Sequence, residues 1–139
     1  MQKYSFLGPN LLNNTLEKVS TTTIQETPKI ALYFSAKWCV PCKEFTPKLI
    51  EAYNEVNKDS KQVEIIFVSG DNDEEEFEAY FKTMPWLSVE FEDVLDELNQ
   101  KYTVTKLPTL KVIDAEGKVK IDDAVGDIKE KGAAAIQGW

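Results

Sequence analysis

The chain has 139 residues, of which 42% are hydrophobic, so it is long enough for one domain with a single core and too apolar for a disordered chain. Its formal net charge of −8 argues against a nucleic-acid-binding protein, because such proteins neutralise phosphates with clustered Lys and Arg. The absence of histidine from the sequence excludes a Cys-His or Ser-His catalytic pair, which leaves nucleophilic chemistry to two cysteines.

The N-terminal region is predicted to extend the edge of a sheet. Residues 15–20 and 21–25 are interpreted as a β-hairpin, so that residues 1–28 form an edge extension of a single domain covering residues 1–139. Residues 1–14 have no basic cluster followed by an apolar run, and the sequence nowhere has the roughly 18 consecutive apolar residues of a membrane helix. We therefore expect a soluble monomer in the cytoplasm or nucleus, without membrane or nucleic-acid partners.

A parallel βαβ unit is predicted next. Residues 29–35 are almost continuously apolar, which is typical of a central strand covered on both faces. A helix that begins near Cys39 is indicated by apolar residues at three- and four-residue spacing: Phe45, Leu49, Ala52, Tyr53 and Val56. Pro47 lacks a backbone N–H and is expected to kink this helix without ending it. Residues 63–68 form a second buried strand, and the intervening helix makes the two strands parallel.

The second half of the chain is predicted to contribute three helices and a hairpin. Residues 71–76 are acidic, which suits a helix N-terminus because carboxylates stabilise the positive end of the helix dipole. The buried faces of two helices are marked by Phe77, Tyr80, Phe81 and Met84 and by Val94, Leu95, Leu98 and Tyr102. Residues 109–113 and 118–121 are predicted to pair as an antiparallel hairpin, and residues 133–136 to form a short helix. This order of elements indicates one mixed α/β domain.

Both cysteines lie at the junction of the first strand and the first helix, in the segment Trp38-Cys39-Val40-Pro41-Cys42. A disulfide across a two-residue spacer closes a ring too short to add much stability, so we expect reversible redox chemistry. The free N–H groups of the helix start stabilise a thiolate and lower the pKa of Cys39 from about 8.5. We predict that Cys39 is the exposed nucleophile and that Cys42, which is less exposed, resolves the mixed disulfide.

Two other interpretations of the cysteine pair are a structural zinc site and inert buried thiols. A monomer offers two of the four ligands that zinc needs, so we expect no metal. The carboxyl ends of strands in α/β sheets face the crevice where ligands bind, which argues against inert thiols. Trp38 is either a core residue or a platform for a substrate chain.

Leu107-Pro108 precedes a predicted strand and has two interpretations. A proline there often only marks the start of the strand. If the Leu107–Pro108 bond is cis, the backbone of Leu107 turns outward and is free to pair with an extended substrate beside the sulfurs.

The segment around the cysteines resembles the nucleoredoxin and tryparedoxin branch of the thioredoxin superfamily. Residues 31–49 read Ala-Leu-Tyr-Phe-Ser-Ala-Lys-Trp-Cys-Val-Pro-Cys-Lys-Glu-Phe-Thr-Pro-Lys-Leu. Further blocks resemble that branch at residues 67–71, 75–77, 84–87, 107–110 and 114–118, so that the resemblance covers roughly residues 15–139.

The resemblance implies a thioredoxin fold, which is a central mixed β-sheet flanked by helices, here with an N-terminal β-hairpin extension. It also implies a redox-active Cys39–Cys42 disulfide in place of a cofactor and a cis Pro108 facing it. We expect the substrate to contact five supporting residues: Trp38, Val40, Pro41, Leu107 and Pro108. The resemblance further implies reduction of disulfides in client proteins, peroxiredoxins among them, with electrons from an unidentified thiol or reductase.

The proton acceptor for Cys42 is not assigned by the resemblance. Ordinary thioredoxins carry a buried aspartate six residues before the first cysteine, whereas this chain has Tyr33, as the branch usually has. Asp71 has two interpretations. We favour a cap for the following helix over a proton relay beside the cysteines.

At three positions the sequence differs from the pattern of this branch in ways that concern the electron donor. The branch usually has proline at the position of Val40, and tryparedoxins carry a tryptophan where Gly70 stands and an arginine where Val125 stands. The latter two are associated with recognition of trypanothione, a glutathione-spermidine conjugate. Their replacement favours a nucleoredoxin-like protein over a trypanothione-specific one.

The sequence therefore predicts a protein-disulfide reductase. The alternative is a redox-dependent binding module that holds a partner in one oxidation state. A peroxidase is not indicated, because the sequence has nothing like a peroxidatic Pro-x-x-x-Thr-x-x-Cys loop.

Overall fold

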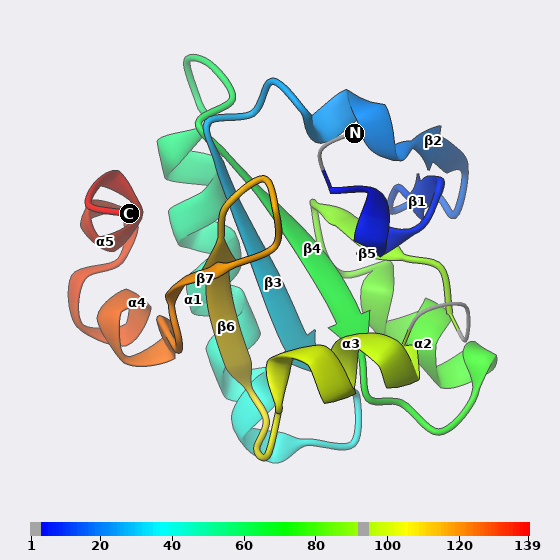
Figure 1. Cartoon of the computed structure of the whole chain (residues 1–139). Coiled ribbons are helices and arrows are strands. Elements are labelled where there is room, and N and C mark those ends of the chain that lie inside the picture. The colour runs from blue at the N-terminus through cyan, green and yellow to red at the C-terminus, as the bar shows by residue number, and fades with distance from the viewer. Residues whose placement is uncertain (1–3, 92–94) are drawn as a thin grey trace.

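The computed structural model describes residues 4–91 and 95–139, through which a seven-stranded mixed sheet runs (Figure 1). The strands are β1 (Asn10–Leu12), β2 (Lys18–Ser20), β3 (Lys29–Ser35), β4 (Val63–Ser69), β5 (Leu87–Val89), β6 (Thr109–Ile113) and β7 (Val119–Ile121). The α-helices are α1 (Val40–Val56), α2 (Glu74–Phe81), α3 (Leu95–Tyr102), α4 (Val125–Lys131) and α5 (Ala133–Gln137). Two 3-10 helices cover Ser5–Leu7 and Thr21–Ile24. The strand order is β2-β1-β5-β4-β3-β6-β7.

The centre of the sheet is the predicted βαβ unit. β3 and β4 pair in parallel from Lys29 opposite Val63 to Ser35 opposite Ser69, and α1 connects them. β6 pairs with the other side of β3 in the antiparallel direction. β3 is therefore hydrogen-bonded on both sides, which explains why its residues are almost all apolar and buried. Pro47 lies inside α1, which continues through it as expected.

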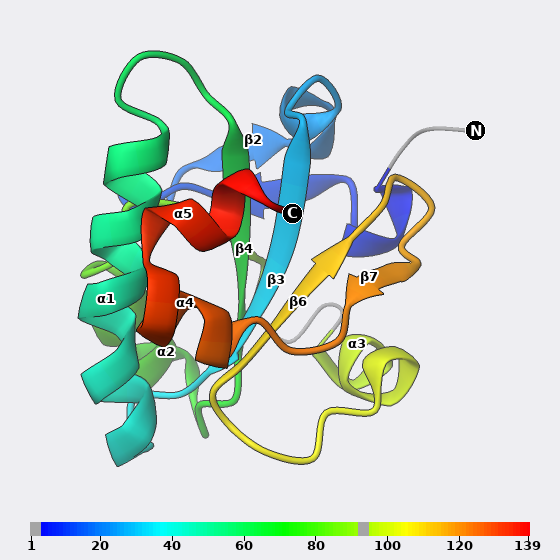
Figure 2. The same ribbon diagram turned by 90° about the vertical axis from the view of Figure 1, so that its left-hand side faces the viewer.

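Helices cover both faces of the sheet. α1, α2, α4 and α5 lie on one face, and α3 lies on the other (Figure 2). The core under α1 and α2 is rich in aromatic side chains, with Trp86 in edge-on contact with Tyr33 and Tyr53 at centroid distances of 5.9 and 5.5 Å. A second core lies under α3 and includes Leu7 and Leu11 of the N-terminal segment. These two cores fix the sheet between its helical layers.

The N-terminal hairpin forms, but its two strands are β1 and β2, of which only β2 (Lys18–Ser20) lies within a predicted strand. β1 pairs with β2, and β1 also pairs with β5, which extends the sheet at its edge. Residues 15–20 therefore supply one strand of the hairpin, but its partner is β1 and not residues 21–25. The side chain of Asn13 accepts the N–H groups of Thr15 and Glu17, each at 3.0 Å, and so folds the start of the first predicted strand into a turn. The second predicted strand is the 3-10 helix Thr21–Ile24, whose first turn is capped by Ser20.

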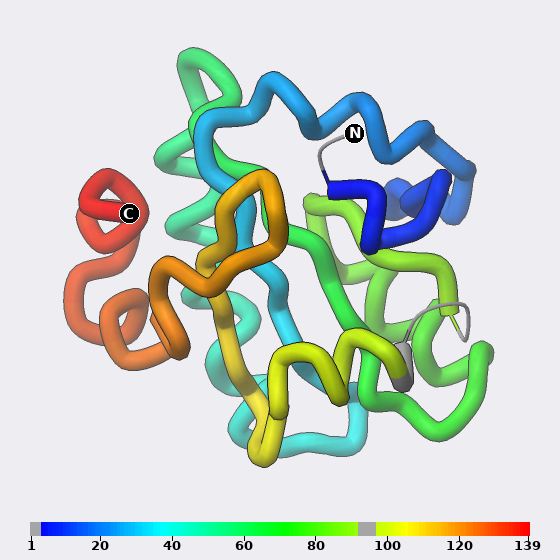
Figure 3. The backbone as a smooth tube through the Cα atoms, in the orientation of Figure 1, coloured from blue at the N-terminus to red at the C-terminus, as the bar shows by residue number. Residues whose placement is uncertain are grey.

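The N-terminal segment also contacts the turn between β6 and β7. Tyr4 donates its backbone N–H to the carbonyl oxygen of Ala115 at 3.2 Å, and the backbone trace brings the two segments together (Figure 3). The φ angle of Gly117 in this turn is +85°, and a Cβ there would lie 2.9 Å from the ring of Phe6. A glycine is therefore required at this turn, because the φ angle is positive and a side chain would clash with Phe6.

The remaining elements agree with the sequence in part. The predicted 109–113 strand, the hairpin after it and the helix near the C-terminus are confirmed, although β7 starts at Val119. α2 ends at Phe81, so Met84 lies beyond the helix, where it is still buried. α3 is confirmed, while Val94 lies outside the described residues. β5 and α4 were not predicted: β5 is too short to show a period, and Gly126 weakens the pattern of α4.

Candidate active site

The start of α1 places Cys39 at the end of β3. Cys39 is the N-cap residue of the helix, and its Sγ accepts the backbone N–H of Cys42 at 3.4 Å. Pro41 lies in the first turn, where a helix start leaves N–H groups unpaired, so its missing N–H costs no hydrogen bond. A negative charge on this sulfur would meet the positive end of the dipole of α1. The position suits a thiolate at Cys39.

Cys39 and Cys42 form a disulfide, with their Cα atoms 5.2 Å apart. Cys42 has an exposed fraction of 0% and Cys39 one of 7%, so Cys42 is the less exposed of the two, as predicted. The expectation of a well-exposed Cys39 is wrong, because Ala36 and Leu107 pack against the pair. Little of Cys39 is therefore exposed to solvent in the disulfide form.

The Leu107–Pro108 bond is cis, as one interpretation of the sequence required. The carbonyl oxygen of Leu107 lies 3.8 Å from Sγ of Cys39. The segment before β6 and the segment before α1 lie at the same end of the sheet, at the lower edge of the ribbon in yellow and cyan (Figure 1). The structure thus brings Leu107 and Pro108 together with the cysteines.

Exposed apolar side chains surround the disulfide. Trp38 and Val40 have exposed fractions of 55% and 64%, and Pro41 is exposed. The core interpretation of Trp38 is therefore wrong. Its Nε1 donates to the carbonyl oxygen of Gly70 at 3.0 Å, which holds the indole across the end of β4. A Cβ at Gly70 would lie 3.2 Å from Cδ1 of Leu107, so a larger residue there would press on the site.

Asp71 lies at the site and is not a helix cap, which corrects the interpretation we favoured. The N-cap of α2 is Asp73, whose Oδ1 accepts the N–H of Glu76 at 2.8 Å. Asp71 is 8% exposed, and its two carboxylate oxygens accept the backbone N–H of Lys37 and the hydroxyl of Ser69, each at 2.6 Å. It thereby ties the loop before Cys39 to the end of β4.

A cluster of buried hydroxyl groups lies behind Cys42. Thr46 donates its hydroxyl to the carbonyl oxygen of Cys42 at 2.8 Å. Tyr33 and Tyr80 lie 2.7 and 2.8 Å from the same hydroxyl oxygen, and Ser35 lies 2.8 Å from that of Tyr80. The hydroxyl of Thr46 has a single proton, which it donates in the hydrogen bond to the carbonyl oxygen of Cys42. Both tyrosines therefore act as donors to Thr46. Burial raises the pKa of Tyr33, which stays a neutral donor.

The sequence analysis missed this cluster. Thr46 stands four residues after Cys42, the spacing at which a hydroxyl reaches back along a helix, and this was the one available signal. Tyr33, Ser35 and Tyr80 come from β3 and α2, so their meeting with Thr46 depends on the fold.

Neither a metal cluster nor a membrane helix occurs in residues 4–91 and 95–139. Within these ranges, the structure contains no group of three or more Cys, Asp or Glu residues arranged to hold a metal ion. No helix in the same part of the chain has the length and apolarity to cross a membrane.

Comparison with known proteins adds three observations. A sequence model of a family described as thioredoxin-like matches residues 28–119. Probable nucleoredoxin 1 of Arabidopsis thaliana is 45% identical over 127 residues, which are 90% of this chain and 22% of that protein. Nucleoredoxin of Danio rerio is 41% identical over 112 residues, which are 79% of this chain and 26% of that protein. The chain thus spans about a quarter of the length of these relatives.

Solved structures show the same likeness. Tryparedoxin II from C. fasciculata superimposes with a TM-score of 0.82 at 29% sequence identity, over 94% of this chain and 88% of that one. The match therefore covers nearly all of both chains.

Proposed function

This chain belongs to the thioredoxin-like family and has its fold, and on that basis we propose that it is a thiol-disulfide oxidoreductase that reduces disulfides in other proteins. The observation that carries the proposal is the position of Cys39. Its sulfur caps α1, is bonded to Cys42 and lies 3.8 Å from the carbonyl oxygen before a cis proline. These features together suit thiol-disulfide exchange at one sulfur.

The proposed reaction proceeds through a mixed disulfide. In the reduced protein, the Cys39 thiolate attacks one sulfur of the client disulfide, the client S–S bond breaks, and the other client sulfur leaves and takes up a proton. Cys42 then loses its proton and attacks the Cys39 sulfur, which releases the second client thiol. The client has then gained two electrons from the two cysteines, and the protein is left oxidised, with a Cys39–Cys42 disulfide that a thiol donor reduces again.

The surrounding residues have separate roles in this proposal. The helix start stabilises the Cys39 thiolate, and the exposed side chains of Trp38 and Val40, with Pro41, offer the client an apolar contact surface. The backbone of Leu107, fixed by Pro108, offers the client a hydrogen-bonding partner beside the sulfur.

Asp71 is our candidate for the group that accepts the proton of Cys42. Its carboxylate is buried and is anchored, through the N–H of Lys37, in the loop that leads to Cys39.

Insulin reduction with dithiothreitol tests the function. The wild-type protein should accelerate the precipitation of reduced insulin, and Cys39→Ser should abolish this acceleration because the remaining thiol, Cys42, is fully buried. Acceleration by Cys39→Ser equal to that of the wild type would contradict the proposal.

The partners can be captured with Cys42→Ser, in which the mixed disulfide on Cys39 is not resolved. We propose that the clients include peroxiredoxins and that the donor is a thiol or a thiol reductase of the cytoplasm or nucleus. Mass spectrometry of the trapped species identifies them, and capture of secretory proteins alone would contradict the location.

A further inference from the structure

A groove of about 460 Å³ lies between α1 and α2, beside the cysteine pair. Its walls are apolar, with Pro47 and Ile50 on the side of α1 and Ala79 and the ring of Tyr80 on the side of α2. Lys37 and Lys43 also line it, and both are exposed. The groove thus combines an apolar slot with two ammonium groups.

Residues that line the groove lie next to the two cysteines along the chain. Lys43 directly follows Cys42, and Lys37 stands two residues before Cys39. Thr46, which also lines the groove, donates its hydroxyl to the carbonyl oxygen of Cys42 at 2.8 Å. A chain whose disulfide is being exchanged at Cys39 therefore has this groove within reach of its neighbouring residues.

The charge of the groove is opposite to that of the protein. The chain has a net charge of −8, yet the described residues that line this groove include no Asp or Glu. In the described part of the chain, neither Lys37 nor Lys43 forms an ion pair, whereas five other lysines do. Two other grooves contain carboxylates of their own, such as Glu51 in one and Glu64 in another. The groove between α1 and α2 therefore favours an anionic occupant.

We propose that this groove binds a client segment in which an apolar side chain stands next to a carboxylate. The apolar side chain enters between Ile50 and Ala79, and the carboxylate pairs with Lys37 and Lys43. This inference rests on the proposed function and names the class of client that the site prefers. The exchange of electrons and protons is the one already described.

Matched peptide substrates test the preference. Each peptide carries one cysteine in a mixed disulfide with 2-mercaptoethanol, then one to six glycines, and then Leu-Glu or Leu-Lys. At low salt, the best Leu-Glu peptide should have a kcat/KM about three- to tenfold above its Leu-Lys counterpart, the range expected for two exposed ion pairs. Because salt screens exposed charges, the ratio should approach one at about 1 M NaCl.

Two variants, each with an alanine replaced by tryptophan, test whether the preference arises in this groove. Ala79→Trp fills the groove, while Ala134→Trp places the same side chain at an exposed position of α5. The Leu-Glu to Leu-Lys ratio should fall close to one in Ala79→Trp and stay at the wild-type value in Ala134→Trp. A ratio that survives Ala79→Trp, or a ratio of one in the wild type at every spacer length, would overturn the proposal.

Two further measurements distinguish client binding in the groove from a loss of the redox activity itself and from dimerisation. Reduction of the neutral bis(2-hydroxyethyl) disulfide by the wild type supports the proposed function alone, and its absence would overturn that function and this inference with it. Sedimentation of the wild type and Ala79→Trp should show the same monomer, whereas a dimer lost in Ala79→Trp would assign the groove to a second copy of the chain and overturn the proposal.

Discussion

At the scale of single residues, the carboxylate of Asp71 holds the loop before Cys39 against the sheet. It is nearly buried, and it accepts one hydrogen bond from the backbone of Lys37 and one from Ser69. Hydrogen bonds to a charged acceptor are stronger than neutral ones, so this group contributes to stability as well as to the geometry of the site.

Asp71→Asn leaves one acceptor oxygen where the carboxylate has two, so it should remove one of the two hydrogen bonds and weaken the other. We expect a loss of about 1–3 kcal/mol in the free energy of unfolding, together with slower insulin reduction because the loop before Cys39 is released. Urea denaturation and the insulin assay measure the two effects. Asp73→Asn is the matched control, since asparagine also caps helices, and it should change both less. Equal losses in the two variants would contradict the role of Asp71.

Thr46→Val tests the hydroxyl cluster. The substitution keeps the shape of the side chain and leaves the buried hydroxyls of Tyr33 and Tyr80 without their acceptor. We expect a loss of roughly 2–4 kcal/mol in the free energy of unfolding, measured in urea, because each unpaired buried donor is costly. Thr83→Val, which removes a hydroxyl from an exposed position, should cost much less. A neutral Thr46→Val would show that the cluster contributes nothing.

The residues of the site differ in how far sequence alone could find them. The cysteines and Pro108 can be found from the sequence because their chemistry depends on residue type and local spacing. Residue type alone left two interpretations of Pro108, of which the cis bond is the one observed. Asp71 was misassigned because an acidic residue before a helix is usually its cap, while here Asp73 takes that place. Which carboxylate turns back to Lys37 depends on where β4 ends.

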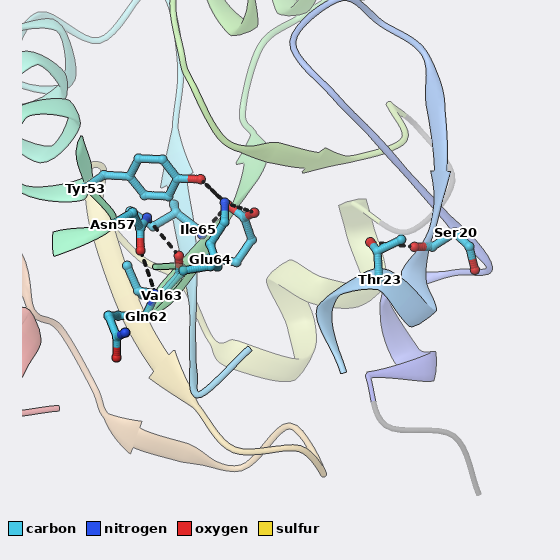
Figure 4. Close-up of polar contacts among 9 residues, drawn as sticks. Ser20, Thr23, Tyr53, Asn57, Gln62, Val63, Glu64 and Ile65 are labelled. Atoms are coloured by element: carbon cyan, nitrogen blue, oxygen red, sulfur yellow. Dashed lines mark hydrogen bonds and ion pairs between the residues drawn. The ribbon is translucent and has the colours of Figure 1, made fainter. Parts of the chain in front are cut away.

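At the scale of elements, Asn57 joins the end of α1 to the start of β4. Its Nδ2 donates to the carbonyl oxygen of Val63 at 3.1 Å, and its Oδ1 accepts the N–H groups of Gln62 and Val63 at 2.8 and 3.2 Å (Figure 4). In the same close-up, Tyr53 donates to the buried carboxylate of Glu64 at 2.8 Å. This junction fixes how β4 enters the sheet.

Asn57→Ala should therefore destabilise the fold without changing the chemistry. The loss of three hydrogen bonds predicts a decrease of about 2–3 kcal/mol in the free energy of unfolding. Asn57→Asp keeps the acceptor and loses only the donor, so its decrease should be smaller. Both variants should reduce insulin at the wild-type rate, because Val63 and Ser69 are at opposite ends of β4, about 20 Å apart. A slower reaction would contradict this separation.

The elements found from the sequence are those with a long or repeated pattern. β3, β4 and α1 are each seven residues or longer; β3 and β4 are nearly continuous apolar runs, and α1 has apolar residues at helical spacing. β5 has three residues and forms because β4 and β1 flank it, which no local pattern shows. The hairpin was placed too late in the chain because the strand-forming residues near Thr15 form a turn around Asn13.

At the scale of the whole molecule, buried tyrosines link stability to alkaline pH. Burial raises the pKa of Tyr33 and of Tyr53, the latter also through the nearby carboxylate of Glu64. Burial, with a smaller effect of Asp114, raises the pKa of Tyr102 to about 12. The folded state therefore keeps protons that the unfolded chain releases near pH 10.

The free energy of unfolding should accordingly be unaffected by Tyr102 below about pH 10 and should decrease as the pH rises toward 12. Each such tyrosine contributes up to about 1.4 kcal/mol per pH unit in this range. Urea denaturation at pH 9, 10 and 11 measures the decrease. Tyr102→Phe should show a shallower dependence by about one proton, and an identical slope in both proteins would contradict the assignment.

The reactivity of Cys39 depends on the whole arrangement, because β3 places it, α1 stabilises its charge and the cis Pro108 segment faces it. The most direct test is the rate of alkylation of the reduced protein by iodoacetamide at pH 7, read for each cysteine by peptide mass spectrometry. We predict that Cys39 is modified first and faster than in the urea-unfolded chain, while Cys42 stays protected. Modification of Cys42 at the same rate, or of Cys39 no faster than in the unfolded chain, would contradict its role as the nucleophile.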